Sequence, residues 1–460
     1  MRIAALASAL LLAGCIGPRP AAPPAATVAP PPAWRTALGP GTPIRADWWQ
    51  GFGDPVLTAL VVRALANSPD IGSAAARVEE ARAQARLAQA QRAPSLTGGV
   101  PLTDARSVSA LGVGATNLGS QPLLQASYDF DLFGRLARAE DAARASLLAT
   151  EAAEDTVRLA LAAGVATGYI SLRALDHRLL IARETLVARA DALRIARRRA
   201  DTGYTSRLEL RQAESEYRAT EQLVAAAGLA VTRQENALSQ LIGDAPGPIA
   251  RGVALDRIAQ PPIPDGLPAD LLRRRPDLFQ AEQTLVAADR TLDSQRAAML
   301  PSLGLTGSAG LVLSTALDQP VGIFSLGASI LSPIFDAGRL RAQADTAAAR
   351  RDQAAFAYRR TALVAFREVN DSLAAVQRAG EQVVALDRQR AALADALRIA
   401  SNRYRAGYSS YLEQLDAQRG LLSAELSLAQ AQADRLTAYA SLYQAMGGGW
   451  TAADIAATTR

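Results

Sequence analysis

Few side chains in this sequence are suited to catalysis. Cysteine and histidine each occur once in the 460 residues, and the sequence contains neither a glycine-rich phosphate loop nor a GxSxG motif. Nucleophilic catalysis needs a nucleophile beside a base, and metal sites need clusters of ligands. The sequence therefore predicts no catalytic residues, no metal site and no cofactor, and a protein that is not an enzyme.

Two carboxylates, in contrast, have a spacing that would attract cations. Glu413 and Asp416 are three residues apart in a helical pattern, just after a glycine turn at Gly407. Both side chains should therefore fall on one face of a helix. The alternative is that both are ordinary solvated positions of a coiled coil.

The single cysteine has a specific position. Arg2 is followed by an apolar segment at residues 3–12, which together indicate a secretory signal. The tetrapeptide Leu12-Ala13-Gly14-Cys15 resembles a bacterial lipobox, whose cleavage would leave Cys15 as the acylated first residue. The alternative is an ordinary cysteine in a signal core. A Pro- and Ala-rich segment follows, and we expect it to be an extended tether that lacks a core.

The acidic pair belongs to the second copy of an internal repeat. The stretch Gly203-Tyr204-Thr205-Ser206-Arg207-Leu208-Glu209 returns as Gly407-Tyr408-Ser409-Ser410-Tyr411-Leu412-Glu413. The two stretches are 204 residues apart, from Gly203 to Gly407. The same repeat offset relates Phe133-Gly134-Arg135-Leu136 to Ala337-Gly338-Arg339-Leu340. A repeat this long indicates duplication of a whole domain.

Long helices must position these residues. Residues 135–201 and 339–405 contain no proline, so each can form one helix about 100 Å long at 1.5 Å per residue. The return stretch at 206–242 is too short to cover that distance. We expect residues 69–93 to supply the remainder as a second helix stacked end to end with it, and residues 276–300 to do the same in the second copy.

Alternating patterns separate the helices of each copy. Residues 124–132 and 324–330 alternate apolar with polar or small side chains, residues 303–313 do so less cleanly, and residues 96–113 are interrupted by Pro101. Soluble sandwiches show the same alternation. After a lipoprotein signal, and without a run of apolar residues long enough for a transmembrane helix, one hairpin per copy indicates a membrane barrel. Two hairpins leave four unpaired edges, so closure requires oligomerisation, and three chains would supply twelve strands.

Composition bounds the remaining classes of function. Net charge is +5 and only 5% of residues are aromatic, as in long, closely packed helices. All the basic side chains are arginines, and they alternate with acidic residues and glutamine along the helical stretches. They do not form a basic patch with interleaved aromatic residues, so we expect no nucleic-acid partner.

Several separated motifs resemble one family. They are Trp48-Trp49-Gln50-Gly51-Phe52-Gly53-Asp54-Pro55, Ala64-Leu65-Ala66-Asn67-Ser68-Pro69-Asp70, Arg274-Arg275-Pro276-Asp277, Ser332-Pro333-Ile334-Phe335-Asp336-Ala337-Gly338-Arg339-Leu340 and Leu412-Glu413-Gln414-Leu415-Asp416-Ala417-Gln418. In this order they resemble the outer-membrane efflux proteins of the TolC type, in the NodT and OprM lipoprotein branch. The resemblance covers residues 15 to about 449.

The resemblance implies a mainly α-helical fold with a β-barrel portion. It implies a homotrimer in which a twelve-stranded barrel in outer-membrane lipid continues as a coiled-coil tunnel in the periplasm. Substrates would arrive through a periplasmic adaptor, a membrane fusion protein, and an inner-membrane pump of the resistance-nodulation-division type. The alternatives are the conduit of an ABC-driven or type I secretion system, or a coiled-coil structural lipoprotein of the envelope. The sequence does not identify the exported compounds or the particular pump.

The resemblance also implies the residues of a periplasmic aperture. Glu413 and Asp416 would face the pore, and three chains would form an acidic ring that favours cations. Glu209 and Tyr404 match two members of a latch that holds such an aperture closed, but Ser409 stands where the latch arginine is expected. The sequence therefore does not decide whether the aperture is closed at rest.

Two further groups of residues follow from the same resemblance. Leu412 would close the aperture by apolar contact if the latch is incomplete. The hairpin tips, which would contact the adaptor, comprise Gly203, Tyr204, Gly407 and Tyr408.

These observations together predict the domain organisation. The segments are a lipoprotein signal peptide at 1–14, a lipid-anchored Pro-rich tether at 15–46, a first repeat at 47–250 with a β-hairpin at about 95–132, an inter-repeat linker at 251–270, a second repeat at 271–449 with a β-hairpin at about 302–334, and a C-terminal tail at 450–460.

Overall fold

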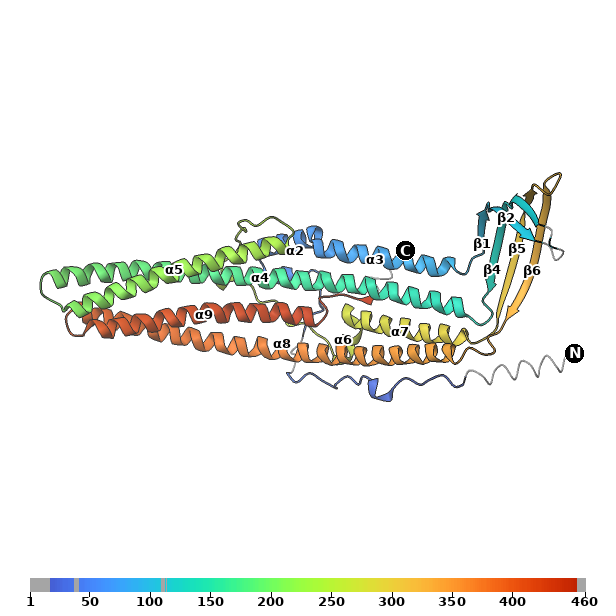
Figure 1. Ribbon diagram of the computed structural model, residues 1–460. Coiled ribbons are helices and arrows are strands. Elements are labelled where there is room, and N and C mark those ends of the chain that lie inside the picture. The colour runs from blue at the N-terminus through green and yellow to red at the C-terminus, as the bar shows by residue number, and fades with distance from the viewer. Residues whose placement is uncertain (1–16, 37–40, 109–111, 113, 453–460) are drawn as a thin grey trace. The chain divides into compact units, whose positions relative to one another are not determined.

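The computed structural model describes residues 17–36, 41–108, 112 and 114–452. These residues divide into two compact units, and Figure 1 shows the helices and strands of the chain. The first unit contains the N-terminal segment up to Val28 together with Ala76–Glu151 and Gln280–Arg360. The second unit contains Ala29–Ala75, Ala152–Phe279 and the chain from Thr361 onward.

The chain is mainly helical, and six of the described helices form three pairs of equal length. The helices are α2 (Pro55–Asn67), α3 (Pro69–Ala90), α4 (Arg135–Asp201), α5 (Arg207–Leu241), α6 (Pro268–Arg274), α7 (Pro276–Ala297), α8 (Arg339–Arg405) and α9 (Tyr411–Ala445), with short 3-10 turns η1 (Pro24–Ala26), η2 (Trp48–Phe52) and η3 (Leu255–Arg257). As the sequence predicts, α4 and α8 are each one helix of 67 residues. Helices α5 and α9 have 35 residues each, and α3 and α7 have 22 each, ending three residues before the predicted positions.

An aspartate caps the start of each long helix. Asp131 accepts hydrogen bonds from the backbone N–H groups of Leu136 at 3.0 Å and Ala137 at 2.7 Å. Asp336 does the same for α8 through the N–H group of Leu340 at 2.9 Å. A carboxylate at this position satisfies N–H groups that have no partner inside the helix and interacts favourably with the helix dipole. The two copies therefore begin their long helices in the same way.

Close backbone approaches place the ends of the shorter helices. Gly243, just after α5, has a positive φ of 78°, and a Cβ there would lie 2.6 Å from the carbonyl oxygen of Asn67. Gly447, just after α9, has φ of 91°, and its Cβ would lie 1.8 Å from the carbonyl oxygen of Arg274. Helix α5 thus ends against the residue before the α2–α3 break, and α9 ends against the α6–α7 break, in agreement with the predicted end-to-end arrangement. Only glycine fits both positions.

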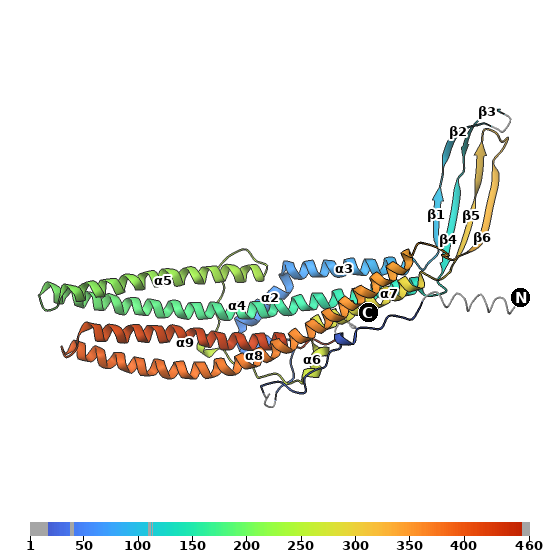
Figure 2. The same ribbon diagram turned by 60° about the horizontal axis from the view of Figure 1, so that its bottom comes forward.

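The strands form one antiparallel sheet of six segments along four lines (Figure 2). They are β1 (Ser95–Gly99), β2 (Leu102–Val108), β3 (Gly114–Ser120), β4 (Leu123–Phe130), β5 (Ser302–Ser314) and β6 (Val321–Leu331). Pro101 separates β1 from β2, and Pro122 separates β3 from β4, because proline lacks the N–H group that a strand ladder needs. The first interruption agrees with the sequence pattern, whereas the pattern did not indicate the second.

The two hairpins of the chain pair with each other. Strand β4 lies antiparallel to β5 from Leu123 opposite Gly310 to Phe130 opposite Leu303. The expectation of four unpaired edges is therefore wrong. Within the described residues, the sheet has two open edges, one at β1 and β2 and the other at β6.

One row of the sheet's apolar side chains is uncovered. On the edge strand β6, Phe324 is 89% exposed, Leu326 79% and Ile330 74%. Small residues such as Gly327 and Ser329 alternate with them. Apolar side chains on one face and small or polar side chains on the other are typical of a sheet with lipid on one side and water on the other.

None of the described helices combines the length and apolar character required to cross a membrane.

The segment at residues 17–28 is held against helices of the first unit. The guanidinium of Arg351 on α8, which is 2% exposed, donates to the carbonyl oxygens of Pro20 at 3.1 Å and Ala21 at 2.9 Å. Arg19 pairs with Asp289 on α7 at 2.6 Å. The expected tether is therefore extended but bound, because arginines reach carbonyl groups that a proline-rich chain leaves free. Cys15 lies outside the described residues.

Candidate functional site at the helical hairpin ends

The two long hairpins end in turns of the same construction. Gly203 and Gly407 have φ values of 73° and 81°. In each turn the next residue, a tyrosine, donates its N–H back into the last turn of the long helix, from Tyr204 to Arg199 O at 2.8 Å and from Tyr408 to Arg403 O at 2.9 Å. A glycine in the left-handed conformation lets the helix stop and the chain reverse. The predicted tip residues therefore lie at the tips of the hairpins.

Apolar side chains surround these tips without cover from the described chain. Tyr204 is 72% exposed and Tyr408 is 80% exposed, and Leu208 and Leu412 are also exposed. Exposed apolar groups are costly in water, and clusters of them mark contact sites for other proteins. The tips are thus suited to bind a partner.

The structure brings together the two residues proposed as a latch. The Tyr404 hydroxyl on α8 donates a hydrogen bond to Glu209 Oε1 on α5, so the contact joins the two hairpins. Tyr404 is 8% exposed, and burial together with the bond to Glu209 raises the pKa of its phenol well above its usual range. The phenol therefore stays protonated at neutral pH and acts as the donor.

An arginine does lie at this contact, but it comes from the end of α4, whereas the expected position, Ser409, lies in the turn between α8 and α9. The guanidinium carbon of Arg199, in the last turn of α4, lies 4.6 Å from the centre of the Tyr404 ring. This geometry is a cation–π contact. Ser409, at the expected position, has a buried hydroxyl without a hydrogen-bond partner among the described residues. The sequence repeat offers a signal for Arg199. The offset that relates Glu209 to Glu413 also relates Arg199 to Arg403, so each hairpin carries an arginine at the same spacing before its glutamate.

The acidic pair is exposed, and one of its members is already paired. Glu413 lies 3.4 Å from Arg403, with the two side chains about half exposed. Asp416 is exposed and forms no ion pair with the described residues. No group of three or more His, Cys, Asp and Glu residues in the described part of the chain could hold a metal ion. Asp416 is therefore the freer of the two carboxylates to attract a cation.

An apolar cluster packs the hairpins together directly behind the latch. It consists of buried side chains from α4, α5, α8 and α9, namely Leu193, Ala196, Ala213, Tyr404, Tyr411 and Leu415. Tyr404 and Tyr411 contact each other with ring centres 5.8 Å apart. The small alanines allow close approach of the helices, as in a coiled-coil seam. This packing fixes the ring of Tyr404 so that its hydroxyl meets Glu209.

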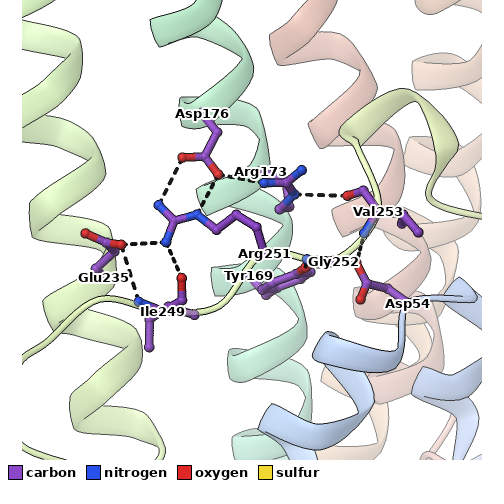
Figure 3. A network of polar contacts seen from close by, with 9 residues as sticks. All are labelled: Asp54, Tyr169, Arg173, Asp176, Glu235, Ile249, Arg251, Gly252 and Val253. Carbon is purple, nitrogen blue, oxygen red and sulfur yellow. Dashed lines mark hydrogen bonds and ion pairs between the residues drawn. The ribbon is translucent and has the colours of Figure 1, made fainter.

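A polar network further along α4 fixes the chain between the two repeats (Figure 3). Asp54, 1% exposed, caps α2 and also accepts from the Tyr169 hydroxyl at 2.8 Å and the Val253 N–H at 3.1 Å. Tyr169 in turn accepts from the Gly252 N–H at 2.8 Å. Asp54 and Tyr169 therefore clamp the start of the inter-repeat linker onto α4.

The second half of the network consists of ion pairs. Arg251 pairs with both oxygens of Asp176 at 2.9 and 3.0 Å and also with Glu235. Arg173 bridges Asp176 at 2.8 Å and the carbonyl oxygen of Val253 at 3.0 Å. The sequence did not indicate this network, because its members are separated along the chain and belong to no local pattern.

Comparison with known proteins agrees with the geometry. The outer membrane efflux protein family model matches residues 60–244 and 267–448. The chain is 36% identical over 409 residues to the cation efflux system protein CusC of Escherichia coli, covering 88% of both chains. It is also 36% identical over 415 residues to the solvent efflux pump outer membrane protein SrpC of Pseudomonas putida, covering 87% of both.

A solved structure supports the same assignment. A crystal structure of CusC matches with a TM-score of 0.83 and 33% sequence identity, covering 94% of this chain and 99% of that chain. The chain belongs to the outer membrane efflux protein family.

Proposed function

We propose that the chain is the outer-membrane conduit of a tripartite efflux system and works as a homotrimer. The sheet carries this proposal: it has two open edges and an uncovered apolar row. Unpaired backbone groups at a sheet edge are costly in lipid, so an open sheet spans a membrane only when neighbouring copies close it into a barrel. Three copies of a sheet with four lines of strand give a barrel of twelve.

A trimer in mild detergent is the expected state of the purified protein. Each β6 edge would pair with the β1 and β2 edge of a neighbour, so the copies should separate only when the sheet is disrupted. Native mass measurement in mild detergent checks this, and planar-bilayer recording checks conduction by the same sample. A stable monomer that conducts ions would contradict the assembly.

The hairpin tips are the proposed contact for a periplasmic adaptor. Their exposed tyrosines, Tyr204 and Tyr408, have the apolar surface and hydroxyl groups that protein interfaces favour. An inner-membrane pump would supply the energy, since the chain has no sequence motif for nucleotide hydrolysis. Relatives named for cation export and for solvent export share similar identity with the chain, so small molecules are the proposed substrate class. Co-purification of the intact complex and sequencing of its components would identify the partners.

A lipid on Cys15 is the proposed second attachment to the outer membrane. Arg296, in the last turn of α7, donates to the carbonyl oxygen of Gly17 at 2.9 Å. This contact holds the chain just after Cys15 beside the helix that leads into β5. An acyl group at Cys15 would therefore enter the membrane close to the strands.

Replacement of Cys15 by alanine should abolish acyl labelling of the mature protein. Some channels should still insert, because one acyl chain alone binds a membrane only marginally and the barrel provides the larger attachment. Metabolic labelling with a palmitate analogue is the measurement, with the Ser409→Ala variant as a labelled control. An unmodified Cys15 thiol in the mature wild-type protein would show the lipid proposal to be wrong.

A further inference from the structure

A single carboxylate between the hairpins is shared by two arginines. Glu216 on α5 binds Arg189 on α4, with Oε2 3.2 Å from Nη2. Its other oxygen, Oε1, accepts from Arg419 on α9, with Nε at 2.9 Å and Nη2 also bonded. Arg189 and Glu216 belong to the first hairpin and Arg419 to the second. Glu216 therefore joins the hairpins, as Glu209 does nearer the tips.

The two arginines differ in their access to water. The Arg189 side chain is 2% exposed, and its Nη1 donates to Gln418 on α9 at 2.7 Å. The Arg419 side chain is 58% exposed. Arg419 can therefore leave Glu216 and be solvated, whereas Arg189 would become an unpaired buried charge if it lost Glu216. Separation of the hairpins breaks the contacts of Arg419 and Gln418 but leaves the Arg189–Glu216 pair intact.

The second repeat lacks this charge pair. The repeat offset relates Arg189 to Leu393 and Glu216 to Gly420. In the structure these two counterparts also face each other, since a Cβ on Gly420 would lie 3.2 Å from Leu393 Cδ2. At this position the second hairpin is therefore packed by an apolar contact. A charge pair is not needed at this position to bring the two helices of a hairpin together.

Glu209 and Glu216 lie seven residues apart on α5, which is about two helical turns. The first receives the Tyr404 hydroxyl from α8 and the second receives Arg419 from α9. Both helices of the second hairpin are therefore tied to α5 along one face. The Arg419 contact brings two nitrogens of a charged guanidinium to its carboxylate, whereas the Tyr404 contact brings one hydroxyl.

We propose that Arg419 and Glu216 form a second, deeper closing contact of the aperture, which must break before the hairpins separate, with Arg189 as the positioning residue that holds Glu216 in place. This inference rests on the proposed role of the chain as a conduit. The contact can break and re-form, because Arg419 is exposed to water and Glu216 keeps its buried partner Arg189. Opening therefore leaves no buried charge unpaired.

The test is the conductance of the intact trimer with Arg419→Gln in a planar bilayer. The variant removes the charged contact of Arg419 with Glu216 and leaves Arg189 paired, so we expect trimers with the wild-type mass and an open fraction raised on the order of tenfold. The open fraction of Arg419→Lys should lie between those of the wild type and Arg419→Gln, since lysine keeps the charge but lacks the fork of donors. The matched control is Arg398→Gln, which removes an exposed arginine that pairs with Asp395 on its own helix.

A variant of the Tyr404–Glu209 latch distinguishes failure of the deeper contact from failure of the conduit role. Tyr404→Phe should also raise the open fraction, because Glu209 loses its donor. If Tyr404→Phe opens the channel and Arg419→Gln trimers conduct as the wild type does, the deeper contact is refuted while the conduit role stands. If no variant and no wild-type preparation conducts, the conduit role is refuted and this inference with it. An equal rise for Arg398→Gln would also overturn the inference, because loss of any surface arginine would then suffice.

Discussion

Replacing Asp54 with alanine is expected to detach the inter-repeat linker from α4 and to lower the stability of the helical unit by about 3 kcal/mol or more. The change removes a helix cap and leaves the Tyr169 hydroxyl and the Val253 N–H without their acceptor. All three groups are buried or partly buried, so water does not replace the carboxylate at low cost. The loss should appear as a lower melting temperature by circular dichroism in detergent.

Hydrogen exchange locates the same effect in the chain. The amides of Gly252 and Val253 should lose protection in Asp54→Ala, while those in the middle of α5 should keep it. Gly252→Ala should have a similar effect without a change of charge, since its Cβ would lie 2.1 Å from Asp54 Oδ1. The control is Asp244→Ala, which removes an aspartate paired at the surface with Arg63 and should change stability by about 1 kcal/mol or less. Equal destabilisation by Asp54→Ala and Asp244→Ala would show that the network does not hold the linker.

The network also sets an expectation for alkaline pH. Burial raises the pKa of the Tyr169 phenol well above its usual range. The hydrogen bond from the Gly252 N–H lowers this pKa, and the hydrogen bond to Asp54 raises it further. The unfolded chain deprotonates this tyrosine near pH 10, before the folded chain does. Its contribution to stability is therefore constant below about pH 10 and falls as the pH rises toward the folded pKa.

Glu413→Gln with Asp416→Asn is expected to weaken both cation preference and block by polyvalent cations at the aperture. Each chain loses two negative charges at the hairpin end, so three chains lose six. Repulsion within such a ring makes a bound cation favourable, and its removal ends that attraction. Trimer stability should change little, because both side chains are exposed and surface charges contribute little to folding. Ion selectivity and polyvalent block in planar bilayers are the measurements.

The ion pair at the tip makes the two single variants unequal. Arg403 already lies 3.4 Å from Glu413, so we expect Asp416→Asn to reduce block more than Glu413→Gln does. The matched control is Asp387→Asn with Asp395→Asn, which removes two exposed carboxylates paired along α8. If the aperture variant kept wild-type selectivity and block, Glu413 and Asp416 would be ordinary solvated positions of the coiled coil.

The sequence by itself determined the elements and the family. Proline-free stretches that end at a turn glycine are enough to define α4 and α8, because helix starts and stops depend on nearby residues. Alternation of apolar and small side chains indicated the lines of β4, β5 and β6 for the same reason. The repeat offset then placed Gly203 and Gly407 at equivalent turns. Each of these signals acts over a few residues of chain.

Only the tertiary structure decided which charged groups meet. A heptad pattern reports which face of a helix is buried, but it does not give the rotation and axial shift of that helix against its partners, and a hydrogen bond requires both to within about an ångström. For that reason the sequence placed Tyr404 and Glu209 at one tip but missed Arg199 above the Tyr404 ring. Arg189 and Arg419 on Glu216, and the pairing of β4 with β5, depend on the same information. These contacts join residues far apart in the chain, and only the packed helices and paired strands bring them together.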